Sequence, residues 1–313
     1  MGSKIPTIEF GKGNLKPGSS DWNRVRNEVR KALEEYGCFE AVYDNSVTME
    51  LDDAIFGVAK DLFNLPKETK RLNVNNPDRP SLGYLGDFPD APHTELTGIY
   101  DALVFENIQS FTNLMWPQGN ASFSEIMYSY TTFVADMEKM VNRMVFESMG
   151  VEKYYNSHVE STEYVLRFLK YEAPGTNEKT LLGVGSHTDK SFLTILHQNQ
   201  VNGLEVQTKH GEWIQLTPAA SSFIVMVGDL FYAWSNGRLH CPRHRAVISG
   251  NESRYSMGLF SFSKMLTQAP EELVDEQHPL LFKPFDCMGL LKFTVCTEEG
   301  QKAESPLKAY CGV

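Results

Sequence analysis

The amino-acid sequence predicts a mainly β protein, with an antiparallel barrel or jelly roll as its core and α-helices flanking it. Three observations carry this prediction. Apolar residues recur at helical spacing before residue 150, short alternating runs separated by turn residues follow from about residue 165, and no internal repeat interrupts either part. We expect residues 1–118 to form a region of helices and strands, and residues 119–313 to form a long helix, the β core and a C-terminal segment.

Length and charge narrow the class of protein. With 313 residues, one core with a helical annex and two separate domains are both compatible with the chain. The formal charge of −11 and the isoelectric point near 5.3 repel nucleic-acid phosphates and anionic membrane surfaces. We therefore expect a small-molecule partner, and neither nucleic acid nor a membrane.

Cysteine usage and the N-terminal residues indicate the compartment. The five cysteines are far apart and form no C-x-x-C pair, which argues against a disulfide framework or a cysteine zinc site. The start "MGSKIPTIEF" lacks the apolar block of a signal peptide. The longest apolar stretch, "FIVMVGDLFYAW", contains Asp229 and is too short to cross a bilayer. The sequence predicts a soluble, cytoplasmic protein.

The first expected elements are two strands and two helices. "KIPTIEF" and "CFEAV" read as short strands. Between them Ser20 opens a helix that Gly37 ends, and Asn45 or Ser46 caps a second helix that Pro66 stops. The expected buried faces are Trp22, Val25, Val29, Leu33 and Tyr36 in the first helix, and Leu51, Ile55, Val58 and Leu62 in the second.

A long loop and a long helix follow. Residues 73–101 are dense in Pro, Gly and Asp, and the length of this stretch indicates a lid or a substrate-facing segment. Ser122 and Glu125 form a capping box before a helix that closes at Gly150. Its apolar stripe is more simply core than a cofactor site, and comprises Phe123, Ile126, Tyr130, Phe133, Met137, Val141 and Met144.

The β core is expected from seven short runs in the second half of the chain. Turn residues separate these runs at the spacing of an antiparallel barrel or jelly roll. They are "YVLRFLKYEA", "SFLTILHQ", "GLEVQT", "EWIQL", "SSFIVMVGD", "HRAVIS" and "RYSMGLFSF".

His187 and Asp189 stand at the head of one such run, in "GSHTDKSFLTIL". Two residues apart on a regular strand, their side chains point to the same side, and Lys190 points to the other. The pair either holds a metal or forms a hydrogen bond within itself. The spacing alone is not specific, because it recurs at three histidines that we expect at the surface, His93, His158 and His210.

A second imidazole favours the metal. His244 opens the later run "HRAVIS" and completes a 2-His-1-carboxylate triad, whereas His240 in the preceding turn is the weaker candidate. Such a triad leaves Fe(II) three open positions, while a structural zinc site needs a fourth protein ligand that the sequence does not offer. We expect His187, Asp189 and His244 to form the metal and catalytic centre.

Arg254 and Ser256 lie on the next run and are spaced to present a guanidinium and a hydroxyl to a carboxylate. Tyr171 can donate its phenol to the same anion. An arginine on the outer, solvated face of the strand fits this single run equally well. The neighbouring triad favours the inward arrangement with an anionic partner, because an unpaired buried charge costs several kcal/mol.

At these residues the sequence resembles the plant iron(II)- and 2-oxoglutarate-dependent dioxygenases, in the superfamily that includes isopenicillin N synthase. The likeness spans almost the whole chain in the order "IPTIEF", "EYGCFEAVYD", "LFNLPKETK", "WPQGN", "SHTDKSFLTIL", "NGLEVQTKHGEWIQL", "VGDLFYAWSNGRL", "HRAV" and "RYS". "EYGCFEA", "LVDEQHPLLFKPFD" and "LKAYCGV" are similar to the branch that contains glucosinolate and steroidal-alkaloid oxygenases.

The resemblance implies a fold and a set of roles. The fold is a double-stranded β-helix flanked by helices. His187, Asp189 and His244 are the implied iron ligands, and Arg254 and Ser256, helped by Tyr171, hold the distal carboxylate of 2-oxoglutarate. Relatives often carry an asparagine at the position of Leu169, so the usual support of the proximal carboxylate is missing here.

The resemblance also implies that Phe260 faces the substrate. We expect further contacts from the 73–101 segment, with Tyr84 and Tyr100, and from Phe111 and Phe262 across the mouth. For each of these aromatic residues taken singly, core packing is the simpler explanation.

The implied reaction consumes dioxygen and 2-oxoglutarate and releases succinate and CO2, with ascorbate as the reductant. It hydroxylates, desaturates or demethylates a small plant metabolite. Two alternatives stay open. One is an aminocyclopropane-carboxylate-oxidase-like enzyme, which shares the triad and the Arg-x-Ser pair but does not use 2-oxoglutarate. The other is a non-catalytic jelly-roll binding protein whose histidines are structural.

Overall fold

Eleven strands and the helices around them are defined in the computed structural model, which describes residues 4–11, 15–43, 49–74, 83–86, 91, 93–175 and 179–313. The described strands are β1 Thr7–Glu9, β2 Cys38–Val42, β3 Thr94–Tyr100, β4 Thr162–Tyr171, β5 Thr180–Leu182, β6 Leu193–Gln198, β7 Leu204–Gln207, β8 Trp213–Gln215, β9 Phe223–Val227, β10 His244–Ser249 and β11 Arg254–Ser263. The described helices are α1 Ser20–Glu35, α2 Met49–Asn64, α3 Lys67–Lys70, α4 Phe105–Met115, α5 Ala121–Ser148, α6 Tyr155–Ser161, α7 Asp229–Trp234, α8 Cys287–Cys296, α9 Glu298–Lys302 and α10 Pro306–Cys311, with short 3-10 turns at Glu152–Tyr154 and Glu271–Leu273.

The strands form two sheets. The larger has the order β1-β2-β9-β6-β11-β4-β3 and the smaller has the order β5-β10-β7-β8. Neighbouring strands are antiparallel except for the parallel pair β1–β2. Each of the seven runs expected in the second half of the chain is a strand, so the predicted jelly roll with flanking helices is confirmed.

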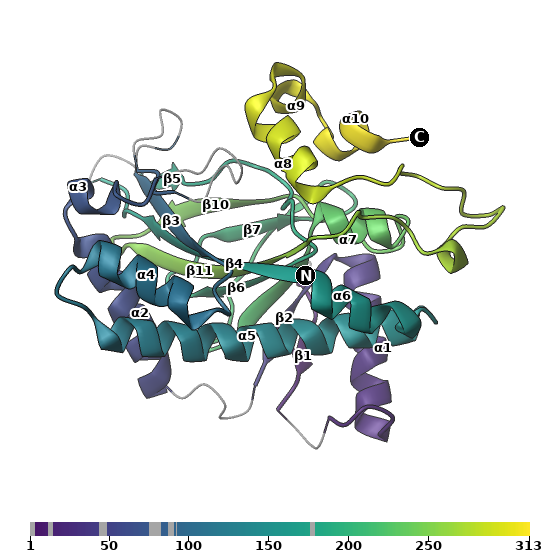
Figure 1. Cartoon of the computed structure of the whole chain (residues 1–313), viewed down its shortest axis with the longest axis horizontal. Coiled ribbons are helices and arrows are strands. Elements are labelled where there is room, and N and C mark those ends of the chain that lie inside the picture. Colours follow the sequence, from purple (N-terminus) through teal and green to yellow (C-terminus); the bar gives the residue numbers. More distant parts are fainter. Residues whose placement is uncertain are drawn as a thin grey trace.

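The two faces of the larger sheet have different neighbours. Residues of one face, among them Phe39, Phe168, Ile195 and Phe223, join a core cluster with α1, α2 and α5. Alternate residues of the same strands turn toward the smaller sheet, where Ile224 and Met226 pack on Leu204 and Val206. Figure 1 shows α5 running along the sheet, with the C-terminal helices α8 to α10 at the opposite side of the molecule. The site described below lies between the sheets and these C-terminal helices.

Helix ends follow local side-chain chemistry, with small differences from expectation. Ser19, rather than Ser20, accepts the capping hydrogen bond from the Trp22 N–H, and Gly37 ends the turn after α1 with φ +71°. Asn120 caps α5 by accepting from the Phe123 N–H, so the expected capping box of Ser122 and Glu125 is wrong. An asparagine two residues earlier takes the capping position, so the helix begins at Ala121.

The expected second helix is α2, and its inner face is shifted slightly. Ile55, Val58 and Leu62 are buried as expected, whereas Leu51 in the first turn of α2 is 40% exposed. The caps expected at Asn45 and Ser46 lie outside the described residues.

The stretch 73–101, expected to be a loop, contains the strand β3. It pairs with β4 along its whole length, from Thr94 opposite Tyr171 to Tyr100 opposite Val165. Alternation did not reveal it because both faces are buried and polar residues occupy them; Thr94 and Thr97 are each 1% exposed. The N-terminal part of the chain therefore supplies an edge strand of the larger sheet.

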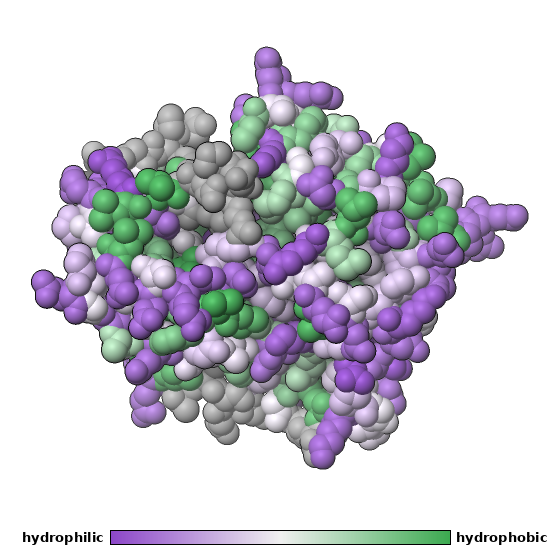
Figure 2. Space-filling view, viewed as in Figure 1, coloured by the Kyte–Doolittle hydropathy of each residue, from purple (hydrophilic) through white to green (hydrophobic). Residues whose placement is uncertain are grey.

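The outer surface is mixed. On the face drawn in Figure 2, hydrophobic residues occur in small separate groups among hydrophilic ones. Among the described residues no helix is both long and apolar enough to cross a membrane. All five cysteines are free.

Candidate active site

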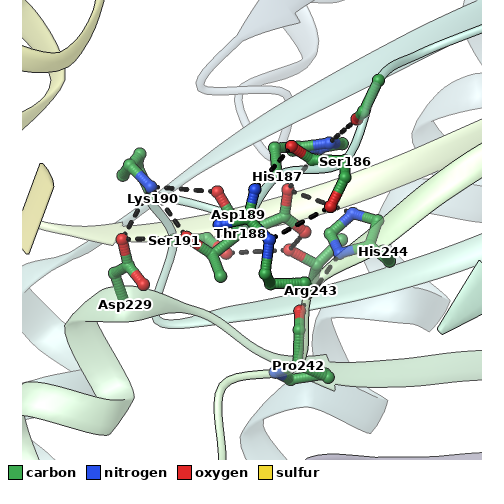
Figure 3. Close-up of polar contacts among 12 residues, drawn as sticks. Ser186, His187, Thr188, Asp189, Lys190, Ser191, Asp229, Pro242, Arg243 and His244 are labelled. Carbon is green, nitrogen blue, oxygen red and sulfur yellow. Dashed lines mark hydrogen bonds and ion pairs between the residues drawn. The ribbon is translucent and has the colours of Figure 1, made fainter. Parts of the chain in front are cut away.

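The side chains of His187, Asp189 and His244 meet between the two sheets. One ligand atom from each lies within 4.8 Å of the others. Oδ1 of Asp189 is 3.6 Å from Nε2 of His187 and 3.6 Å from Nε2 of His244. His244 opens β10, and backbone hydrogen bonds of 3.1 Å and 2.9 Å pair His187 with it (Figure 3). The sequence-predicted triad is thus brought together in space.

The segment that carries His187 and Asp189 is not a regular strand. Only an isolated bridge holds His187, and β6 begins later, at Leu193. The expected direction of the Lys190 side chain assumed strand alternation, which this segment does not have. Lys190 lines the same cavity as His187 and Asp189, and its ammonium donates to Thr188 and Asp229.

Backbone carbonyls orient the two imidazoles. Nδ1–H of His187 donates to the carbonyl of Gly185 at 2.8 Å, and Nδ1–H of His244 donates to that of Pro242 at a longer 3.4 Å. In both rings Nε2 is left as the basic nitrogen that faces Asp189. Burial lowers the pKa of His244 to about 4, so this ring is neutral at neutral pH. A neutral imidazole is the form that binds a metal.

Thr194 fixes the carboxylate of Asp189. Its Oγ1–H donates to Oδ2 at 2.7 Å, and Ser191 in turn contacts Thr194 at 2.8 Å. Oδ1 is left to face the two imidazoles. Burial on its own would raise the pKa of Asp189, but the two neighbouring imidazoles and the hydrogen bond from Thr194 outweigh it, so the pKa is lowered and the group is ionised.

Two cavities adjoin the triad, and both are lined by His187 and Asp189. The smaller, of about 70 Å³, is also lined by Tyr171, Arg254 and Ser256. The larger, of about 660 Å³, extends to the C-terminal helices and is lined there by Leu291, Thr294, Val295, Gly300, Gln301, Ala303, Glu304 and Pro306. The triad therefore lies between a small chamber that contains a buried guanidinium and a much larger cavity.

Arg254 is fixed in the small chamber by hydrogen bonds and keeps one unused hydrogen-bond donor. Its guanidinium donates to Ser256 Oγ at 3.2 Å and to Gln198 Oε1 at 2.8 Å, and lies 5.1 Å from the centre of the Tyr171 ring. Arg254 is 2% exposed, and its Nε–H has no acceptor among the described residues. Burial lowers the pKa of Arg254, an effect that Tyr171 opposes. A buried cation with an unused donor is suited to a small carboxylate.

Sequence reasoning missed Thr194 and Gln198. Thr194 acts through a hydrogen bond to Asp189, five residues earlier, and Gln198 acts through a hydrogen bond to Arg254 on the neighbouring strand; no motif in the chain signals either contact. Thr194 does alternate with Leu193 and Ile195 in β6, so a polar residue on the inner face of an apolar run was the available signal.

The aromatic residues expected near the substrate divide into two groups. Phe260 and Phe262 line the large cavity. Tyr84 donates to Glu95, Phe111 stacks on Phe123 and Phe168 in the core, and Tyr100 ends β3. A substrate contact stays a prediction for these last three.

Of the other histidines, His158 is not at the surface as expected. It is 9% exposed and its Nε2 accepts from Asn142, because α6 folds back onto α5. His240 is partly buried, and its backbone N–H donates to Leu33 of α1. It is not part of the described cluster.

Comparison with known proteins identifies the family of this chain. The model of the 2OG-Fe(II) oxygenase superfamily matches residues 148–263, and that of the non-haem dioxygenase in morphine synthesis N-terminal region matches residues 5–100. The probable 2-oxoglutarate-dependent dioxygenase AOP1.2 of Arabidopsis thaliana is 46% identical over 98% of this chain and 95% of its own. The chain belongs to the 2OG-Fe(II) oxygenase superfamily.

Solved structures of this superfamily share the fold. The Arabidopsis dioxygenase for auxin oxidation 1, in complex with 2-oxoglutarate, is 28% identical with a TM-score of 0.78, covering 88% of this chain and 100% of that one. The rice dioxygenase for auxin oxidation is 27% identical with a TM-score of 0.80, covering 98% and 100%. The predicted family and enzyme class are confirmed.

The site of this oxygenase fits the groups its family uses. Two imidazoles and one carboxylate are a donor set for Fe(II) that leaves open positions. The unused Nε–H of Arg254, beside the hydroxyls of Ser256 and Tyr171, suits one carboxylate of 2-oxoglutarate. Leu169 lines both cavities, and its apolar side chain offers no amide donor to the other carboxylate there.

Proposed function

We propose that the chain oxidises a small plant metabolite in the large cavity, with dioxygen as the second substrate and succinate and CO2 as co-products. The balanced hydroxylation is R–H + 2-oxoglutarate + O2 → R–OH + succinate + CO2. Desaturation and demethylation are variants of the same oxidation. The single observation that carries the proposal is the position of the triad, between a small chamber with a buried guanidinium and a cavity of about 660 Å³.

In this proposal His187, Asp189 and His244 are the iron ligands. Fe(II), when bound, supplies the coordination of 2-oxoglutarate and the activation of dioxygen. The protein's part is positional: Gly185 and Pro242 hold the imidazoles, and Thr194 holds one oxygen of the carboxylate so that the other faces the metal.

Arg254, Ser256 and Tyr171 hold the distal carboxylate of 2-oxoglutarate. Tyr171 is a neutral donor, since burial raises its pKa. Gln198 keeps the guanidinium in place, which leaves its remaining donors aimed into the chamber. The grip sets the distance from the keto acid to the metal, because Arg254, Ser256 and Tyr171 line the same small chamber as the triad.

The substrate lies in the large cavity, against Phe260 and Phe262, and the C-terminal helices cover it. Their cover keeps bulk water from the reacting C–H bond. The AOP1 relatives are named only as probable 2-oxoglutarate-dependent dioxygenases, and their Arabidopsis origin supports a plant metabolite. The acidic charge of −11 argues against nucleic-acid binding. The five free cysteines support a cytoplasmic location, because that compartment keeps thiols reduced.

The test is an incubation of plant metabolite extracts with enzyme, Fe(II), ascorbate and 2-oxoglutarate. We expect succinate, together with compounds that gain one oxygen or lose two hydrogens or a methyl group. Oxidised compounds without succinate would indicate an oxidase of the aminocyclopropane-carboxylate type. If neither succinate nor oxidised compounds form in any extract, while the enzyme is folded and holds Fe(II), the proposal is wrong.

A further inference from the structure

Arg167 is the one cation of the large cavity that no described residue pairs with. Lys190 is bound to Asp229, and Arg243 donates from Nε and Nη2 to the hydroxyl and carbonyl of Ser186. Arg167 is partly exposed and lines the cavity, and among the described residues its recorded partner is the ring of Phe260, whose centre lies 5.6 Å from the guanidinium carbon. Its charge is therefore open to whatever occupies the cavity.

The strand register explains why Arg167 has no partner. It lies on β4, opposite Gly258 of β11 on one side and opposite Gly98 of β3 on the other. Neither glycine has a side chain to bond it. The Phe260 ring covers Gly258 so closely that a Cβ there would lie 2.6 Å from Phe260 Cε2. Glycine on both sides opens room for the guanidinium, and Phe260 gives it an aromatic surface.

Among the described residues no acid is hydrogen-bonded to Arg167, and the carboxylate of Asp189 acts on its charge only from a distance. Burial lowers the pKa of Arg167, an effect opposed by the carboxylate of Asp189. An aromatic face offsets only part of such a desolvation penalty. An arginine at this position is explained if a bound ligand supplies a negative charge to it. A charged hydrogen bond formed away from water is among the strongest contacts that a binding site can make.

Arg167 does not serve 2-oxoglutarate. Gly258, its cross-strand neighbour, is four residues from Arg254 on β11, which places the two backbone positions about 13 Å apart along the strand. Arg254 lines the small chamber and not the large one, whereas Arg167 lines the large one and not the small one. The two guanidinium groups face different molecules.

We propose that Arg167 binds an anionic group of the substrate, so that the metabolite oxidised here is an organic acid, either a carboxylate or a sulfate ester. The inference rests on the proposed function and adds the substrate class. The anion fixes one end of the molecule beside Phe260, and the apolar remainder lies along Phe262 and Leu291. Arg167 thereby decides which C–H bond faces the metal.

The first part of the test separates plant extracts by anion exchange at neutral pH and incubates both fractions with the Fe(II)-loaded enzyme and 2-oxoglutarate. We expect the oxidised compounds in the retained, anionic fraction. A second separation at pH 2 distinguishes the two sources of charge, because carboxylates then pass through and sulfate esters are still retained. Substrates found only in the neutral fraction would overturn the inference.

The second part uses variants on the compound so identified. Arg167→Met keeps the length of the side chain without its charge, and we expect it to raise KM for the compound by about thirtyfold or more. Arg167→Lys is expected to recover part of this loss. Arg143→Met is the matched control, since Arg143 also lies over aromatic rings, those of Trp22 and Tyr155, but on α5 away from both cavities. It is expected to match the wild type.

Binding of the compound, measured calorimetrically without oxygen, must fall in parallel with the rise in KM, while KM for 2-oxoglutarate stays within about twofold of the wild type. An unchanged KM for the compound in Arg167→Met, or a rise confined to 2-oxoglutarate, would overturn the inference and leave the proposed function standing. No succinate and no oxidised compound in any fraction would instead remove the proposed function, and this inference with it.

Discussion

The ammonium of Lys190 lies 2.7 Å from Oδ2 of Asp229, and only 11% and 7% of the two side chains are exposed. Lys190 also donates to the carbonyl and hydroxyl oxygens of Thr188, and the N–H of Asp229 donates to the carbonyl of Asp189. The pair therefore ties the irregular segment between His187 and β6 to the start of α7 (Figure 3). This pair therefore supports the segment that carries His187 and Asp189.

Lys190→Met should weaken both the fold and the metal site. Removing one member of a buried ion pair leaves the other unpaired, so we expect the free energy of unfolding to fall by about 3 kcal/mol. The affinity for Fe(II) should fall by about tenfold, because the ligand segment loses its support. Urea denaturation and anaerobic Fe(II) titration measure the two effects.

Lys264→Met is the control for this substitution. It removes a more exposed pair, with Glu163, and should change stability by less than about 1 kcal/mol. If Lys190→Met lost stability but bound Fe(II) as tightly as the wild type, the pair would be structural and without influence on the ligands.

Thr194→Val should loosen the carboxylate of Asp189. Valine has nearly the shape of threonine but cannot donate to Oδ2, which then lacks its 2.7 Å hydrogen bond. We expect Fe(II) affinity to fall by about tenfold, as for other groups that orient metal ligands. Thr194→Ser keeps the hydroxyl and should bind Fe(II) nearly as the wild type does. Equal affinities for the valine and serine variants would contradict the assigned role.

Gly203→Ala should weaken the binding of 2-oxoglutarate indirectly, by displacing Arg254. A Cβ at this position would lie 2.9 Å from Ile248 Cδ1 and 3.0 Å from Arg254 Cδ, so the arginine has to move. We expect KM for 2-oxoglutarate to rise by about tenfold with Fe(II) affinity unchanged. Gly57→Ala in α2, where a Cβ meets nothing within 4 Å, is the control. An unchanged KM would mean that Arg254 does not hold the cosubstrate.

His158 should make the fold sensitive to acid. Burial lowers its pKa to about 4 from an ordinary 6.5, so the unfolded chain binds a proton more readily than the folded one. Its contribution is complete above pH 6.5 and is lost as the pH falls toward 4, which amounts to about 2 kcal/mol between pH 7.5 and pH 5. Burial raises the pKa of Glu138, which Asn142 links to His158, and this acts in the opposite direction.

His158→Gln isolates this contribution, since glutamine still accepts a hydrogen bond but does not titrate. Unfolding in urea at pH 7.5 and at pH 5 should show a drop for the wild type that is smaller by about 2 kcal/mol in the variant. Equal drops in both proteins would assign the acid sensitivity to other groups.

Much of the fold was readable from the chain because regular elements carry regular patterns. The runs that became β4 and β6 to β11 alternate or are apolar throughout, and the spacing of Arg254 and Ser256 on one strand placed both in the same small chamber. The proximity of His187 and His244 was also predicted from strand patterns, although the segment that carries His187 is not a strand.

The failures have a common physical cause: tertiary contacts replaced the local pattern. β3 went unseen because its buried positions are polar and gain their partners only on folding. The prediction for the direction of the Lys190 side chain assumed a regular strand, and the turn before β6 is not one. The sequence did not indicate a role for Arg167, because a single arginine in an apolar strand does not reveal that two glycines lie opposite it on the neighbouring strands.

The most direct measurement for the central claim is an anaerobic equilibrium titration with Fe(II) of the wild type and four alanine variants. We predict one ion per chain, with binding lost or weakened at least about a hundredfold in His187→Ala, Asp189→Ala and His244→Ala. In His240→Ala, whose histidine precedes His244 by four residues and lies outside the cluster, binding should be unchanged. Full Fe(II) affinity in the three triad variants would contradict the account.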